Sequence, residues 1–238
     1  MLESLKNKKI LVIVAHPDDE LLGQGATINL LSKKFNCNIK TVILGEGITS
    51  RANERDTDKW SQELIQHKSN ITNACEKVGY KSFSTYDFPD NRFDQVNLLD
   101  IVKVIESEIE TFKPSVIFTH HPGDTNIDHR LTHDAVLPAI RPMKGQTVET
   151  LITFETPSST EWQSPDHENS FIPNFFVEVE EKNIDAKIEG MQSYYFEKRE
   201  YPHPRSPESL KILSKRWGIV IGTEFAEAFR VIRTISRI

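Results

Sequence analysis

Two short stretches of this chain concentrate histidine and carboxylate side chains. Residues 15–20 carry one imidazole and three carboxylates, and residues 120–130 carry further histidines and aspartates. Imidazole nitrogen and carboxylate oxygen are ligands of zinc, and a catalytic zinc keeps one coordination position open for water. Two imidazoles and one carboxylate, with water as the fourth ligand, form a hydrolytic zinc site. The residue types therefore predict a metal-dependent hydrolase.

His16 and Asp19 are the first two candidate ligands. They lie three residues apart on a turn that leads into a helix, so both side chains can point to one place. His129 is the best candidate for the third ligand, because it also lies where a loop leads into a helix. Asp18, beside the ligands, could then accept a proton from the metal-bound water, since the metal lowers the pKa of that water.

An alternative is that these acids only cap helices. Aspartate is a normal N-cap residue, and a second acid in the first turn complements the helix dipole. Asp128 could cap the helix that begins near His129 in the same way. We favour the metal interpretation because both clusters directly follow an apolar run that is typical of a buried strand.

Those two apolar runs, residues 9–14 and 115–119, are the elements that must position the clusters. Both are rich in β-branched residues, as in strands of a parallel sheet that are buried on both faces. Ligands of open α/β sheets bind beyond the carboxyl ends of the strands, at a topological switch point. The two strands could be neighbours at that point, which would bring the clusters together.

The remainder of the first 142 residues alternates between strands and helices. Such alternation predicts βαβ units, and hence an α/β fold with a mostly parallel sheet and helices on both faces. The expected strands are 39–44 and 82–85, and the expected helices are 21–31, 58–78, 98–109 and one from about 129.

The rhythm changes beyond residue 142. Strands are expected over 148–154, 175–179 and 226–235, and helices over 184–196 and 208–217. No repeat or linker interrupts the chain. We therefore predict one domain over 1–238, with a core of 1–142 and a C-terminal elaboration of 143–238.

Composition limits the class of partner and the compartment. The net charge of −6, with both signs interspersed, argues against nucleic acid or an anionic membrane surface as the main partner. Two cysteines without a CxxC pair fit a reducing compartment. The N-terminus is too polar for a signal peptide, and no apolar run reaches the roughly 18 residues that span a bilayer. We expect a cytoplasmic protein without membrane insertion; a homo-oligomer stays open.

Other catalytic motifs fit poorly. The pairs Gly23–Gly25 and Gly45–Gly47 both lack the third glycine of a dinucleotide-binding loop. The chain contains no Walker-type phosphate loop and no Gly-x-Ser-x-Gly elbow, which argues against a serine hydrolase.

Several segments resemble one known family. Residues 15–20 look like the signature of the PIG-L/LmbE-like zinc-dependent N-acetyl-sugar deacetylases, and residues 126–130 look like its second motif. The tract 120–130, the loop 202–206 and the tail 226–229 are similar to the bacterial LmbE-like branch. The resemblance spans nearly the whole chain.

This resemblance implies a Rossmann-like three-layer sandwich and a hydrolase that removes acetyl from an amino-sugar nitrogen. By matching motif positions, His16, Asp19 and His129 would bind Zn²⁺ and Asp18 would be the general base. Asp128 would tune that base or orient a ligand. The products would be acetate and a free amino sugar.

One position departs from the family pattern. Some relatives carry a histidine that stabilises the reaction where this chain has Asn126. His203 is therefore our candidate for the oxyanion donor or leaving-group acid, with His121 as the second choice.

Arg51, Arg205 and Asn126 are candidate substrate contacts. A guanidinium at this edge of the sheet could clamp a phosphate or sugar hydroxyls. The alternative for both arginines is a solvated loop charge.

The expected substrate is a small N-acetylated amino sugar, either nucleotide- or glycoside-linked. A zinc amidase or deformylase acting on another N-acyl group is a second hypothesis, and a non-catalytic Rossmann-like binding module is a third. Another divalent metal could replace zinc, because nitrogen and oxygen ligands suit several.

Overall fold

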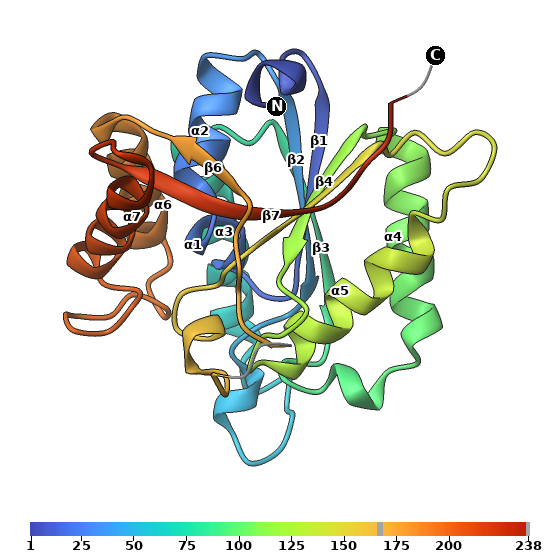
Figure 1. The fold of residues 1–238 in the computed structure, drawn as a ribbon. Coiled ribbons are helices and arrows are strands. Elements are labelled where there is room, and N and C mark those ends of the chain that lie inside the picture. The colour runs from blue at the N-terminus through green and yellow to red at the C-terminus, as the bar shows by residue number, and fades with distance from the viewer. Residues whose placement is uncertain (166–168, 237–238) are drawn as a thin grey trace.

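A mostly parallel sheet forms the centre of the molecule. The computed structural model describes residues 1–165 and 169–236, and in them the strand order is β3-β2-β1-β4-β5-β7-β6 (Figure 1). Neighbouring strands from β3 to β5 are parallel, whereas β7 is antiparallel to both β5 and β6. The predicted fold class is confirmed. The strands are β1 (Lys9–Val14), β2 (Asn38–Gly45), β3 (Ser82–Phe88), β4 (Val116–His120), β5 (Thr150–Phe154), β6 (Phe175–Glu178) and β7 (Ala226–Thr234).

Helices cover both faces of this sheet (Figure 1). The α-helices are α1 (Asp19–Leu22), α2 (Gly25–Lys33), α3 (Ser61–Val78), α4 (Leu98–Phe112), α5 (Ile127–Ala139), α6 (Glu181–Ser193) and α7 (Pro207–Ile221). Short 3₁₀ helices are η1 (Leu2–Leu5), η2 (Thr49–Arg51), η3 (Phe93–Gln95) and η4 (Thr160–Trp162).

Alternate side chains of β1 enter two separate cores, because successive residues of a strand point to opposite faces. Ile10 and Val12 belong to the core that α1, α2, α3 and α6 cover. Leu11 and Ile13 belong to the core under α4 and α5. The apolar run of β1 is therefore continuous because both of its faces are buried.

The topological switch point lies at β1. This strand pairs with β2 on one side and with β4 on the other, and Ile13 lies opposite Thr119 of β4. The prediction that the first strand and the strand over 115–119 are adjacent in the sheet is confirmed. The loops that follow β1 and β4 consequently emerge side by side.

The helix expected over 21–31 is interrupted. It divides into α1 and α2 at Gly23 and Gln24. A Cβ atom at Gly23 would lie 2.1 Å from the carbonyl oxygen of Glu155, so only glycine permits this close packing. The Gln24 side chain donates a hydrogen bond to the carbonyl of Asp19 at 3.2 Å. Packing against residue 155 therefore outweighs the helical pattern.

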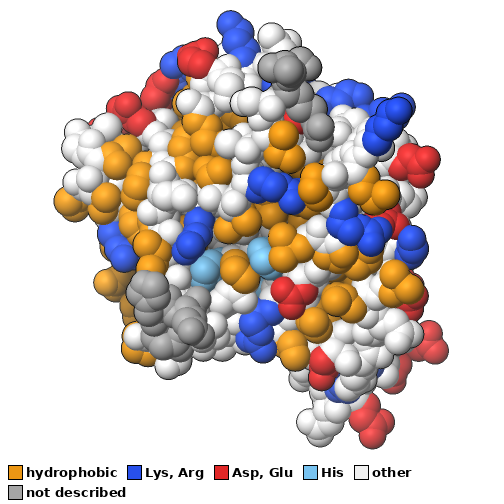
Figure 2. Space-filling model, turned by 45° about the vertical axis from the view of Figure 1, so that its right-hand side comes forward, with side chains coloured by type: hydrophobic (Ala, Val, Ile, Leu, Met, Phe, Trp, Pro, Cys, Tyr) orange, Lys and Arg blue, Asp and Glu red, His pale blue; other side chains and the backbone are white. Residues whose placement is uncertain are grey.

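The surface carries charges of both signs. On the face in Figure 2, hydrophobic side chains gather across the middle, and basic and acidic side chains lie among and around them. Among the described helices, none combines the length and the hydropathy that crossing a membrane requires.

Candidate active site

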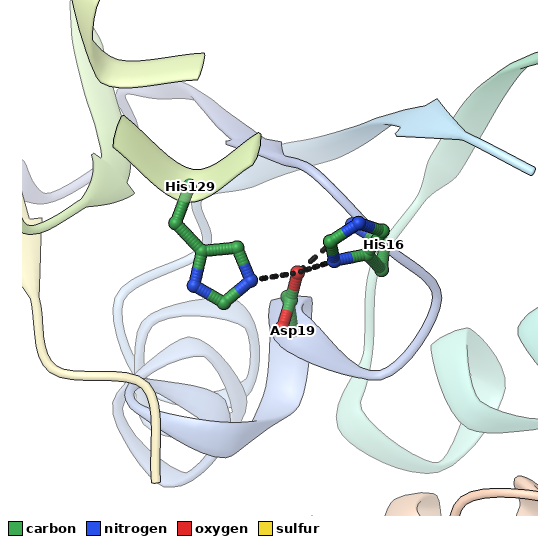
Figure 3. Close-up of side chains that lie close together, drawn as sticks. All are labelled: His16, Asp19 and His129. Atoms are coloured by element: carbon green, nitrogen blue, oxygen red, sulfur yellow. Dashed lines mark hydrogen bonds and ion pairs between the residues drawn. The ribbon is translucent and has the colours of Figure 1, made fainter. Parts of the chain in front are cut away.

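Asp19 is the centre of the candidate site (Figure 3). It follows the turn after β1, and its Oδ2 atom lies 3.3 Å from Nδ1 of His16 and 3.2 Å from Nε2 of His129, which α5 supplies. The Asp19 carboxylate also accepts the backbone N–H of His16 at 2.8 Å. One ligand atom from each of the three residues lies within 4.8 Å of the others. The structure thus brings the three predicted ligands together.

The outer nitrogen of each histidine faces another carboxylate. His16 Nε2 lies 2.9 Å from Asp128 Oδ2, and His129 Nδ1 lies 3.2 Å from Asp124 Oδ1. Histidines that bind metals commonly donate their second N–H to such a carboxylate, which fixes the ring. His16 could therefore offer Nδ1, and His129 could offer Nε2, to a cation.

The electrostatics at this point favour positive charge. Burial lowers the pKa of His129, but Asp19 and Asp124 outweigh that effect and raise it to about 9. His16 behaves alike: Asp128 and Asp19 raise its pKa well above the usual value despite its burial. Carboxylates that stabilise a charge between two imidazoles suit a divalent cation, so this set of donors fits a metal site.

The helix-cap alternative fails for Asp128 and Asp18. Asn126, not Asp128, caps α5: its side-chain oxygen accepts the backbone N–H of Asp128 at 2.8 Å. The Asp128 carboxylate instead accepts the N–H of Phe93 at 2.9 Å and contacts His16. Asp18 stands at the N-cap of α1, yet its side chain makes no capping hydrogen bond.

Asp18 has an unusual backbone conformation and a buried carboxylate. Its φ of 101° is rare for residues other than glycine, although aspartate and asparagine tolerate positive φ better than most. The N–H of Asp18 donates to the buried Glu20 at 2.9 Å, and Tyr194 donates to the same carboxylate. Burial raises the pKa of Asp18 well above the usual value, against the opposing effect of Arg205. Asp18 is therefore suited to accept a proton.

A cleft of about 260 Å³ opens over these residues. Residues 196–205, between α6 and α7, form part of its wall. His203 lines it, and its Nδ1 accepts the backbone N–H of Arg205 at 3.2 Å, which leaves Nε2 to carry the proton of a neutral ring. Burial, together with Arg205 and Arg199, lowers the pKa of His203. A neutral Nε2–H at the cleft can donate to an oxyanion.

The three predicted substrate contacts also line the cleft, but their polar atoms have protein partners. Arg205 contacts Asp18 Oδ2 at 2.8 Å and Glu197 Oε2 at 2.7 Å. Arg51 pairs with Glu197, and the Asn126 amide donates to Asn91 Oδ1 at 2.9 Å. These contacts favour a role for Arg205 in holding Asp18.

His121, the second choice for the oxyanion donor, lies outside this cleft as the described residues define it. Its Nε2 donates to the carbonyl of Asn169 at 2.8 Å. His120 is buried beside the site: its Nε2 accepts the N–H of Ala15 at 3.0 Å, and its ring stacks on His129. His120 therefore packs against the site, whereas His121 does not reach it.

Sequence reasoning missed three acids of this site. Asp124 and Glu20 lie inside the two clusters already identified, so their positions were a usable signal. Besides its contact with His129, Asp124 accepts hydrogen bonds from Ser159 and Thr160. Glu197 lies far along the chain in an irregular segment, and nothing in the local sequence indicates its role.

Comparison with known proteins gives a family match and two informative relatives. Residues 11–140 match the family model described as PIG-L: GlcNAc-PI de-N-acetylase. The chain is 27% identical to an uncharacterized deacetylase, YaiS, of Escherichia coli (strain K12), over 79% of this chain and 91% of the relative. It is 26% identical to a probable N-acetyl-alpha-D-glucosaminyl L-malate deacetylase 2 of Bacillus cereus, over 57% of this chain and 62% of that protein.

Solved structures share the fold at low identity. N,N'-diacetylchitobiose deacetylase from Pyrococcus horikoshii has a TM-score of 0.70 and 17% identity, over 95% of this chain and 84% of that one. The zinc-inhibited form of teicoplanin deacetylase Orf2 has a TM-score of 0.72 and 16% identity, over 96% and 100%. GalB, a 4-carboxy-2-hydroxymuconate hydratase from Pseudomonas putida KT2440, has a TM-score of 0.72 and 17% identity, over 97% and 99%. The fold therefore hosts more than one reaction, and the site must decide.

Proposed function

Because this chain belongs to the PIG-L family, we propose that it is a metal-dependent hydrolase that removes the acetyl group from an N-acetylated amino sugar. The observation that carries the proposal is the convergence of His16, Asp19 and His129 beside Asp18 under one cleft. The names of the curated relatives, which are deacetylases, support an enzyme acting on N-acetyl groups. The proposal that the substrate is an amino sugar is based on the description of the family and on the name of the Bacillus relative.

We assign the metal ligands as His16 Nδ1, Asp19 Oδ2 and His129 Nε2, with Asp128 and Asp124 fixing the two rings. Zinc is the expected ion, since two imidazoles and one carboxylate form a common catalytic zinc set, although other divalent ions accept the same donors. When bound, the ion would polarise the acetamide carbonyl and lower the pKa of a water molecule.

The side chains around the ligands complete the reaction. Asp18 accepts the proton of the water that attacks the acetamide carbon. The Nε2–H of His203 donates to the oxygen as negative charge develops there. The carbon–nitrogen bond then breaks, the proton passes from Asp18 to the leaving nitrogen, and acetate and a free amine result.

The three polar residues of the rim divide between two roles in this proposal. Arg51 and Asn126 contact the sugar, because both line the cleft beside the ligands. Arg205 holds Asp18 through the 2.8 Å contact of its NH1 group.

The alternatives predict different outcomes in one assay. The metal-free protein is loaded separately with zinc, cobalt or manganese and incubated with N-acetylglucosamine, a glycoside of it, N,N'-diacetylchitobiose and N-formylglucosamine. Released amine and released acid are measured. We expect amine and acetate in equal amounts from at least one N-acetyl sugar, and only from metal-loaded protein.

Three results would replace the proposal. Release of formate alone would indicate a deformylase. A protein that retains no metal and releases no amine would be the binding module. In a separate incubation with an unsaturated tricarboxylate, loss of its ultraviolet absorbance would indicate a hydratase like the structural neighbour. The carboxylate of Asp18, placed beside the ligands but outside their set, argues against the binding module.

A further inference from the structure

Glu197 joins two arginines that come from different parts of the chain. Its Oε2 contacts Arg205 at 2.7 Å, and its Oε1 contacts Arg51, which lies in η2 after β2. Arg205 continues the series to Asp18 at 2.8 Å. Four side chains of alternating charge thus run from the floor of the cleft to its rim.

Burial strengthens this series at its inner end. The side chain of Asp18 is 3% exposed and that of Glu197 is 12% exposed, whereas that of Arg51 at the rim is 36% exposed. Charge pairs that are partly buried are screened less by solvent and salt than exposed ones. The inner contacts of Glu197 are therefore the ones able to fix a geometry.

The guanidinium of Arg205 contacts three side chains at once. Its Nε donates to Ser158 Oγ at 2.7 Å, while the same NH1 group contacts both Asp18 and Glu197. A planar guanidinium fixes these directions together, which a flexible ammonium would not do. Without the Glu197 carboxylate, Asp18 would be the remaining acid on Arg205 within the described part of the chain, and the guanidinium could rotate toward it.

We propose that Glu197 is a positioning residue, which holds Arg205 so that Asp18 keeps its place beside the metal ligands and which fixes Arg51 at the rim. The positioning itself follows from the contacts. Its kinetic consequence rests on the proposed function. The residue acts through the two arginines and does not contact the reacting atoms.

The positioning can be measured without turnover. In the zinc-loaded protein, the arginine Nε–H signals are observed by ¹⁵N NMR and assigned with the variants R205K and R51K. We expect the Arg205 Nε–H, which donates to Ser158, to exchange with water at least about tenfold faster in Glu197→Gln. The substitution removes the negative charge and leaves a single acceptor oxygen for two arginines, so the guanidinium is held less firmly. An unchanged exchange rate in a folded E197Q protein would overturn the proposal.

The consequence is read from a double-mutant cycle. We expect Glu197→Gln to lower kcat by roughly 10- to 100-fold, since a small misplacement of a catalytic group can cost about 100-fold. The double variant E197Q/R205Q should be no slower than Arg205→Gln alone, because both act through one contact. The matched control is Glu189→Gln, whose carboxylate contacts Lys77 on the surface at 3.3 Å and should leave kcat unchanged.

The outcomes separate the two proposals. Additive losses in the cycle would show that Glu197 does not act through Arg205 and would overturn the inference alone. If the wild-type protein acts on no N-acetyl sugar, the proposed function fails, and the NMR exchange rates still decide whether Glu197 positions Arg205. Circular dichroism of each variant confirms that it is folded.

Discussion

At the scale of single residues, the proposed mechanism assigns metal binding and proton transfer to different side chains. Each of the two histidines proposed as ligands contacts Asp19 on one side and a further carboxylate on the other. Asp18 lies outside this set: its backbone is left-handed, and its carboxylate contacts Arg205. Adjacent aspartates can therefore perform different tasks.

The first prediction concerns Asp18. The substitution Asp18→Asn should lower kcat by about 10²–10⁴-fold, since it removes a general base, while the metal bound per chain stays at the wild-type level. Asparagine tolerates the positive φ at this position, so the turn should be retained. Steady-state kinetics and elemental analysis of the same sample measure both quantities. Full activity in this variant would remove Asp18 from the role of base.

The second prediction concerns Asp128. Asp128→Asn should weaken metal binding by roughly 10- to 100-fold, because His16 loses the carboxylate that fixes its ring. Competition with a chromophoric chelator measures the affinity. Asp134→Asn is the matched control on the same helix, since the Asp134 side chain is 54% exposed and its carboxylate contacts His133 instead of a proposed ligand. Equal affinities in D128N and D134N would contradict the assignment.

At the scale of elements, the C-terminal strand holds the helix that follows the first motif. The Glu227 carboxylate of β7 accepts the N–H groups of Ala26 at 3.2 Å and Thr27 at 2.6 Å, at the start of α2. It also pairs with Lys187 of α6 at 2.8 Å. A residue some 200 positions away in sequence thus satisfies donors that a local N-cap would otherwise satisfy.

The third prediction tests this contact. Glu227→Gln should lower the free energy of unfolding by about 3–5 kcal/mol, because it leaves a buried lysine without its charge partner. Side-chain exposures of 5% for Lys187 and 3% for Glu227 justify the value for a buried pair. Urea denaturation measures the change. The exposed pair of Lys77 and Glu189 is the comparison, and Glu189→Gln should change stability by less than about 1 kcal/mol. Similar losses in both variants would refute the prediction.

At the scale of the whole molecule, the cleft is assembled from both ends of the chain. The turn after β1 and the start of α5 supply the proposed ligands. The segment between α6 and α7 supplies Glu197, His203 and Arg205. Protein hydrogen bonds and ion pairs hold these groups, and the two cores on either side of the sheet are apolar. The fold should therefore persist without the metal.

The fourth prediction follows from that assembly. Removal of the metal by a chelator should abolish activity and leave the circular dichroism spectrum unchanged, and returning zinc should restore activity. At a free zinc concentration 100 times Kd, binding to the native state should add about 2.7 kcal/mol of stability, seen as a higher Tm. His129→Ala should show no such shift. Full activity after exhaustive chelation would contradict the metal-dependent mechanism.

The sequence alone determined the order of strands and helices, apart from the break between α1 and α2, and the parts of the site that lie in motifs. A strand that is buried on both faces, such as β1, has a continuous apolar sequence. A helix that covers one face of the sheet, such as α4, has apolar residues at helical spacing. A parallel sheet binds ligands at the turns that follow such strands. The proximity of His16, Asp19 and His129 could therefore be predicted from the sequence. The division of the chain at residue 142 and the catalytic roles stay predictions.

Only the tertiary structure decided the contacts between distant segments. The break between α1 and α2 depends on the carbonyl of Glu155, and the support of His129 depends on Asp124. Glu197 lies in no recognisable sequence motif. It contacts Arg51 and Arg205 only because folding brings the segments together. Local patterns record which face of an element is buried; they do not record which side chain from another element lies against it.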